Sequence, residues 1–149
     1  MVKVINMIYD IYPENVELPL TEILMLAAGG LNHYPEWAQK KILSNYTPEQ
    51  VIQTTSQMIL DKNVPSGIKY NLFFFCLYNY GLGENADRVK ELIYAAANFD
   101  WDKTLIPTNF KRHLKDEIIP TYLQYYQQKE QEILLKRSKH IQYEIEEEN

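Results

Sequence analysis

Residues 47–81 read TPEQVIQTTSQMILDKNVPSGIKYNLFFFCLYNYG, and two consecutive helices with clear boundaries are predicted within them. Thr47 can cap the first turn, and Gln50 can reach back to the cap. Pro48 suits the first helical position, because its missing N–H would have no partner there. The apolar spacing that follows predicts a helix with one buried face, made of Val51, Ile52, Thr55, Met58 and Ile59.

The second helix of this stretch is expected at about Ser66–Tyr80, between Pro65 and Gly81. Its residues are apolar on nearly every side, and a helix without a polar face belongs in the middle of a bundle. Glycine is a common residue just after a helix, so Gly81 predicts the end of this one.

Prolines punctuate the rest of the chain in the same way, at Pro19, Pro35 and Pro107. Residues 2–12 fit a short amphipathic helix better than a strand, because the sequence offers no strand to pair with. The other expected helices are about Leu20–Ala28, Pro35–Asn45, Asn85–Asn98 and the segment from Thr108 onward. The predicted fold is therefore all-α, an antiparallel multi-helix bundle or short helical array of six to seven helices within one domain, residues 1–149.

The last helix is the longest. Pro120 lacks the backbone N–H of a helix interior, so we expect the helix to be kinked near this residue. Residues of about 120–147 outrun the short helices before them, and we expect this half either to project or to pack on another chain. Its apolar stripe consists of Leu123, Tyr126, Ile133, Leu134, Ile141 and Ile145.

Charge is distributed unevenly along the chain, which has a net charge of −5. Residues 1–102 carry seven Lys or Arg against twelve Asp or Glu, a balance of −5. Residues 103–139 carry eight basic and four acidic side chains, a balance of +4, and the last ten residues carry four glutamates. The sequence thus describes an acidic body, a basic helical segment and an acidic tip, a pattern that bears on partners rather than on fold.

Catalytic, metal and nucleotide motifs do not emerge from the sequence. His113 and Glu117 lie four apart, but a zinc-protease helix needs a second histidine. The single cysteine, Cys76, lies in an apolar run and is predicted to be a buried, inert thiol of a reducing compartment. We therefore expect no cofactor, no metal and no membrane span, and a cytoplasmic location. The predicted core includes Leu24, Ile52, Ile59, Phe74, Leu77, Leu92 and Leu114.

The preferred function is a non-enzymatic protein-binding module, a small acidic inhibitor or immunity-type protein that neutralises or regulates a basic toxin or enzyme. This is an analogy of class, based on acidity and aromatic content. Trp101 lies between two aspartates in an expected loop, so it is the first choice for a contact residue. The predicted partner-binding residues are Asp100, Trp101, Asp102, Tyr122, Tyr126 and Ile133.

Three alternatives remain open. An enzyme would need a site assembled from distant residues such as His33, Tyr34 and His113. The basic segment with its tyrosines could bind single-stranded nucleic acid, although the acidic tip would repel phosphate. A homodimer through the C-terminal helix is the third, because the opposite charges of Lys136, Arg137 and Lys139 and of the final glutamates favour antiparallel pairing.

Overall fold

The computed structural model describes residues 18–29 and 34–148, with side chains for residues 18–29 and 36–140. All of the regular structure in these residues is helical, which confirms the predicted all-α helical array. The helix expected within residues 2–12 lies outside the described residues.

Short helices precede one long one. The α-helices are α2 (Leu20–Ala28), α3 (Tyr34–Asn45), α4 (Pro48–Leu60), α5 (Ser66–Tyr80), α6 (Lys90–Asn98), α7 (Thr108–Arg112) and α8 (Ile119–Glu148). Two 3-10 helices, η1 (Gly83–Val89) and η2 (Trp101–Lys103), and a π turn, η3 (His113–Ile118), lie between them.

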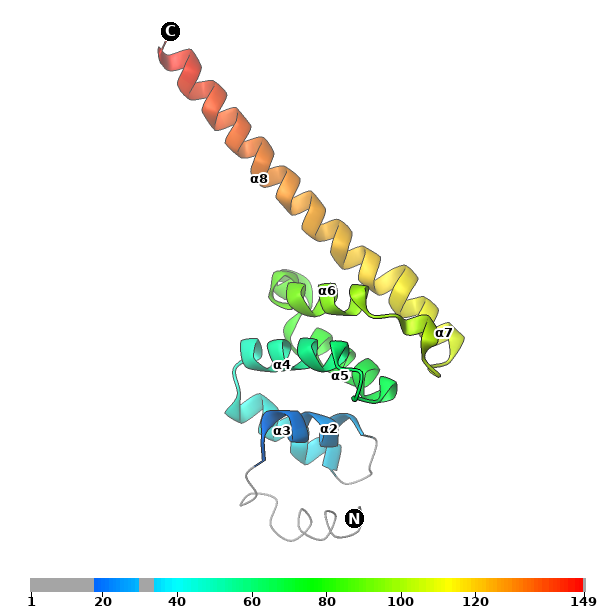
Figure 1. Cartoon of the computed structure of the whole chain (residues 1–149). Coiled ribbons are helices and arrows are strands. Elements are labelled where there is room, and N and C mark those ends of the chain that lie inside the picture. The colour runs from blue at the N-terminus through cyan, green and yellow to red at the C-terminus, as the bar shows by residue number, and fades with distance from the viewer. Residues whose placement is uncertain (1–17, 30–33, 149) are drawn as a thin grey trace.

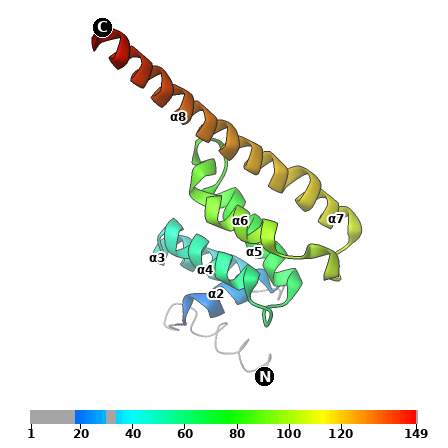
Figure 2. The same ribbon diagram turned by 45° about the horizontal axis from the view of Figure 1, so that its top comes forward.

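The helices stack in sequence order, as Figure 1 shows. Helix α2 contacts α3, α4 and α5, and α4 contacts α5 and α6. Helix α6 in turn contacts α8, which runs past it and extends beyond the rest of the molecule in both Figure 1 and Figure 2. We call the described residues up to 118 the body.

The core runs through the stack and follows the predicted apolar faces. Six of the seven predicted core residues are buried, namely Leu24, Ile52, Ile59, Leu77, Leu92 and Leu114. Phe74 is the exception, because it is only partly buried at the edge of the core. The neighbouring Phe73 is fully buried in its place.

The prolines predicted to begin helices lie at or next to the helix starts in the structure. The Thr47 hydroxyl accepts from the Gln50 N–H at 3.2 Å, and the Gln50 side chain accepts from the Thr47 N–H at 2.9 Å. This reciprocal pair is the predicted capping box. Pro19 and Pro65 lie one position earlier than the first helical turn, as N-caps in extended backbone conformation.

The segment expected to open the helix at Asn85 forms the 3-10 helix η1 instead. The turn after α5 is very tight: a Cβ at Gly81 would lie 2.6 Å from a methyl carbon of Val89. Gly83 has φ of +58°, a conformation that glycine tolerates best. The more tightly wound η1 thus lets the chain fold back against the end of α5, and α-helix resumes only at Lys90.

Helical backbone continues from Thr108 to Glu148 through the π turn η3. The Ile119 N–H donates to the carbonyl of Leu114, five residues earlier, and Pro120 follows directly. A hydrogen bond between residues five apart is the π-helix pattern, which occurs mostly as single turns inside longer α-helices. The expected kink near Pro120 stays a prediction. No helix among the described residues is both long and apolar enough to cross a lipid bilayer.

Candidate functional site

Two tyrosine hydroxyls attach the start of α8 to the body. The Tyr122 hydroxyl donates to the carbonyl of Gly81 at 2.9 Å, and the Tyr126 hydroxyl donates to the carbonyl of Ala86 at 2.6 Å. Tyr126 is buried, and this burial raises the pKa of its phenol. Tyr126 was predicted to contact a partner, but its side chain is already enclosed by the body. The half-buried Tyr122 keeps one edge available, and its role in partner binding stays a prediction.

Ion pairs follow one turn further along α8. Lys129 pairs with Asp87, and the Lys90 ammonium lies 3.7 Å from a carboxylate oxygen of Glu130. Lys90 also lies 5.5 Å from the centre of the Tyr126 ring. Exposed ion pairs contribute little to the free energy of unfolding, so together they orient α8 more than they stabilise it. These contacts with the body end at Glu130.

We call residues 131–148 of α8 the arm. Every side chain from residue 131 to 140 is exposed. Three of them are large and apolar: Ile133 is 45% exposed, Leu134 62% and Leu135 55%. The arm would extend about 27 Å at the rise of an α-helix. Contiguous exposed apolar groups on a projecting helix are typical of a contact surface.

Trp101 lies in the core, contrary to its prediction as an exposed loop residue. Its side chain is only 1% exposed, and its ring nitrogen donates to the carbonyl of Ala96 at 2.8 Å. The ring also packs edge-on against Phe99, with centroids 4.8 Å apart. Burial removes Trp101 from the surface that a partner can reach, and its bond to Ala96 instead fixes the connection after α6.

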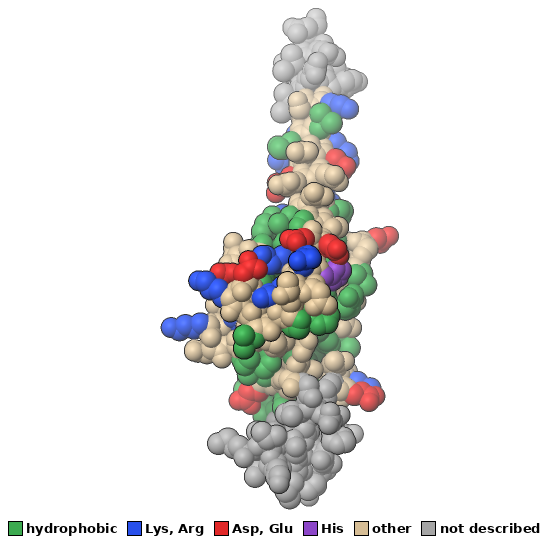
Figure 3. Space-filling view, turned by 90° about the vertical axis from the view of Figure 1, so that its right-hand side faces the viewer, with side chains coloured by type: hydrophobic (Ala, Val, Ile, Leu, Met, Phe, Trp, Pro, Cys, Tyr) green, Lys and Arg blue, Asp and Glu red, His purple; other side chains and the backbone are tan. Residues whose placement is uncertain are grey.

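Asp100 and Asp102 remain at the surface, but both have local partners. The Asp100 carboxylate accepts from the Asp102 N–H at 3.2 Å and lies 3.7 Å from Lys103. Asp102 accepts from the Lys115 ammonium at 2.6 Å, which lowers the pKa of the Asp102 carboxyl. Figure 3 looks onto this end of the molecule, where basic and acidic side chains lie side by side. The charges largely offset one another here, and a binding role for the two aspartates stays a prediction.

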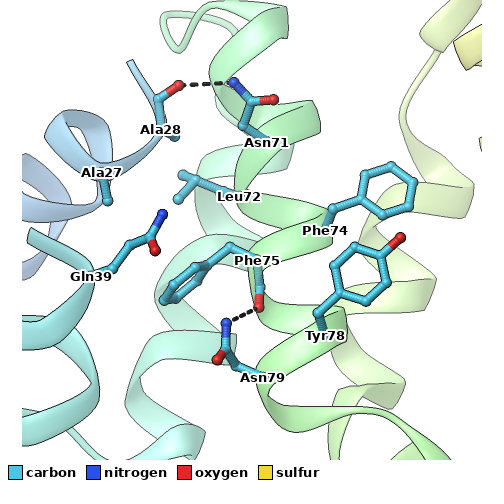
Figure 4. A pocket seen from close by; sticks show the side chains of 9 residues that line it. All are labelled: Ala27, Ala28, Gln39, Asn71, Leu72, Phe74, Phe75, Tyr78 and Asn79. Atoms are coloured by element: carbon cyan, nitrogen blue, oxygen red, sulfur yellow. Dashed lines mark hydrogen bonds between the residues drawn. The ribbon is translucent and has the colours of Figure 1, made fainter. Parts of the chain in front are cut away.

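A groove of 390 Å³ opens between α2, α3 and α5, as Figure 4 shows. Asn71 and Asn79 in this groove already donate to the backbone carbonyls of Ala28 and Phe75, at 2.9 and 2.8 Å. Tyr78 carries the only titratable group among the lining side chains. The lining consists of Ala27, Ala28, Gln39, Asn71, Leu72, Phe74, Phe75, Tyr78 and Asn79. The groove therefore offers aromatic, aliphatic and amide side chains without a carboxylate, an imidazole or an amine for acid–base chemistry.

The residues of the enzyme alternative are only partly described. His33 and the side chain of Tyr34 lie outside the described part. His113 is on the exposed side of η3, where its Nδ1 lies 2.5 Å from a carboxylate oxygen of Glu117. The described residues contain no group of three or more His, Cys, Asp or Glu suited to a metal ion.

The thiol of Cys76 is buried, as predicted. Cys76 is fully buried, and its thiol lies 3.4 Å from the Thr55 hydroxyl. Burial raises the pKa of the thiol to about 12, so it stays protonated and unreactive at neutral pH.

No protein-family model, curated protein or solved structure matches this chain. The exposed arm is therefore the feature on which a functional proposal can rest. The groove between α2, α3 and α5 lacks reactive groups, and Asp100 and Asp102 already pair with neighbouring lysines.

Proposed function

We propose that this chain is a non-enzymatic protein-binding module that contacts its partner through the arm. The observation that carries the proposal is the exposure of Ile133, Leu134 and Leu135 on a helix that has left the body. Most helical stability in proteins comes from tertiary packing, and the exposed side chains of residues 131–140 lack it. A partner that covers the arm would supply this packing.

The specific form that we propose is a small acidic inhibitor or immunity-type protein, which neutralises or regulates a basic protein. The balance of −5 over residues 1–102 supports this form. Opposite charge accelerates the encounter of two proteins, while a few buried apolar anchors supply most of the affinity. The free thiol of Cys76 supports the cytoplasm, a reducing compartment, as the place of action.

The test is affinity purification from the native cell with the full chain and two variants. The arm variant replaces Ile133, Leu134 and Leu135 with glutamine. The matched control is Leu105→Gln, because Leu105 is a fully exposed leucine in the loop before α7. We expect the arm variant to reduce partner recovery at least tenfold, a loss of ~1.4 kcal/mol, and the control to leave it unchanged. Equal recovery with all three proteins would refute a role for the arm.

A further inference from the structure

Helix positions at alternating spacings of three and four residues, the repeat of two paired helices, form a seam along the arm. Leu134 is its described apolar member, and the sequence continues it through Ile141 and Ile145 in the last turns of α8. The complete seam is Gln131, Leu134, Ser138, Ile141, Ile145 and Glu148. Its polar members make it a weak seam, and Arg137 and Glu144 are the charged residues whose helix positions flank it.

The charges of the arm are complementary to themselves. A basic turn with Lys136, Arg137 and Lys139 precedes an acidic end with four glutamates between residues 144 and 148. Two arms aligned in parallel would oppose like charges along their whole length. Two antiparallel arms would place each basic turn near the acidic end of the other, and charge complementarity fixes orientation in this way.

We propose that the partner of the arm is a second copy of this chain, paired antiparallel. This inference rests on the proposed function of the arm as a protein-binding surface and assigns that surface to a second copy, which leaves the acidic residues 1–102 as the surface for a basic protein. The arrangement has two-fold symmetry, in which the same surface serves both subunits, as in most homodimers.

The seam selects one register. Seam pairing about the midpoint of residues 139 and 140 places Leu134 opposite Ile145 and Ser138 opposite Ile141, with Arg137 beside Glu144. The same register overlaps residues 131–148 of both copies, and this is the part of α8 beyond Glu130, where its contacts with the body end. The two Glu130 positions would then be about 29 Å apart along the arms at 1.5 Å per residue. The bodies would lie at opposite ends of the pair.

The primary test is sedimentation of the full chain and of two variants. Leu134→Gln removes the described apolar seam residue, and Leu105→Gln is the matched control. We expect a concentration-dependent dimer for the full chain and for the control, and at least tenfold weaker association for Leu134→Gln. High salt should weaken the wild-type dimer, because the charges that orient it are exposed.

A charge exchange tests the identity of the partner. One variant carries Lys136→Glu, Arg137→Glu and Lys139→Glu, and the other carries Glu144→Lys, Glu146→Lys and Glu147→Lys. The first has a uniformly acidic arm and the second a mainly basic one, so each alone should be monomeric, whereas an equimolar mixture should form a heterodimer. Small-angle scattering of the wild-type dimer should show two separate bodies joined by a rod.

Three results would overturn the inference: a full chain that stays monomeric at high concentration, charge variants that each dimerise like the wild type, or a dimer with its bodies side by side. If the full chain is monomeric, and the arm variant fails to recover a different protein that the full chain binds, the proposed function stands and the second copy is refuted as the partner. If mutation of the arm weakens neither the dimer nor the recovery of a partner, both the dimer inference and the proposed function of the arm are refuted.

Discussion

Tyr126→Phe should destabilise the protein while leaving its shape almost unchanged. The substitution keeps the ring, which packs near Tyr94 and Tyr125, and removes only the hydroxyl that donates to Ala86 at 2.6 Å. The side chain is 2% exposed, so water cannot replace the donor that the Ala86 carbonyl loses. A buried group that loses its hydrogen bond costs ~1–3 kcal/mol.

Urea unfolding followed by far-ultraviolet circular dichroism measures this loss. A change of 1 kcal/mol corresponds to ~2–4 °C in melting temperature for a chain of this size, so a thermal scan gives an independent check. The midpoint should fall without a change in slope, because the surface exposed on unfolding is unchanged.

Two further tyrosines serve as matched controls. Tyr122→Phe removes a partly buried bond and should cost ~0.5–1.5 kcal/mol. Tyr78 is 61% exposed, and Tyr78→Phe should change stability by less than ~0.5 kcal/mol. If Tyr126→Phe unfolds at the same urea concentration as Tyr78→Phe, the hydroxyl of Tyr126 does not hold α8 to the body.

Tyr80→Phe should stabilise the protein by up to ~1–3 kcal/mol in thermal unfolding, because the buried Tyr80 hydroxyl has no hydrogen-bond partner among the described residues. Burial raises the pKa of the Tyr80 phenol from 10.0 to about 12. The contribution of this raised pKa to the free energy of unfolding is therefore full below pH 10.0 and is lost as the pH rises toward 12. Tyr80→Phe should make alkaline unfolding less steep. Burial lowers the pKa of Lys69, against the opposing effect of Asp61, so this group makes stability increase with pH between its lowered pKa and 10.5. Lys69→Met should remove that increase in a series of urea titrations, whereas an unchanged pH profile would show that Lys69 keeps its ordinary pKa. Leu77→Ala should cost ~2–5 kcal/mol in the same assay, and a wild-type midpoint would remove Leu77 from the core.

Helix positions were predictable wherever the signal was local. Thr47, Pro48 and Gln50 act within one turn of each other, and α5 occupies the predicted range, Ser66–Tyr80. The 3-10 helix η1 was not predictable in this way. Its conformation depends on the close approach of Val89 to Gly81, which arises only when the chain folds back on α5.

The candidate site was predicted less well, for the same physical reason. Aromatic residues serve equally as core and as contact surface, and composition does not distinguish the two. Trp101 and Tyr126 are buried because their polar atoms meet the carbonyls of Ala96 and Ala86. The spacing of Tyr122 and Tyr126, one turn apart, was a signal that one face of α8 packs on the body.

The sequence by itself determined the all-α class, most helix boundaries, the apolar faces and the uneven distribution of charge, because each depends on neighbours within a few residues along the chain. Only the tertiary structure decided which aromatic side chains are enclosed and where α8 leaves the body. The enclosure of Tyr126 and the attachment of α8 depend on the bonds of Tyr122 and Tyr126 to carbonyls 41 and 40 residues away in the sequence. Contacts of that kind carry no local signature, since any sufficiently apolar surface can supply them.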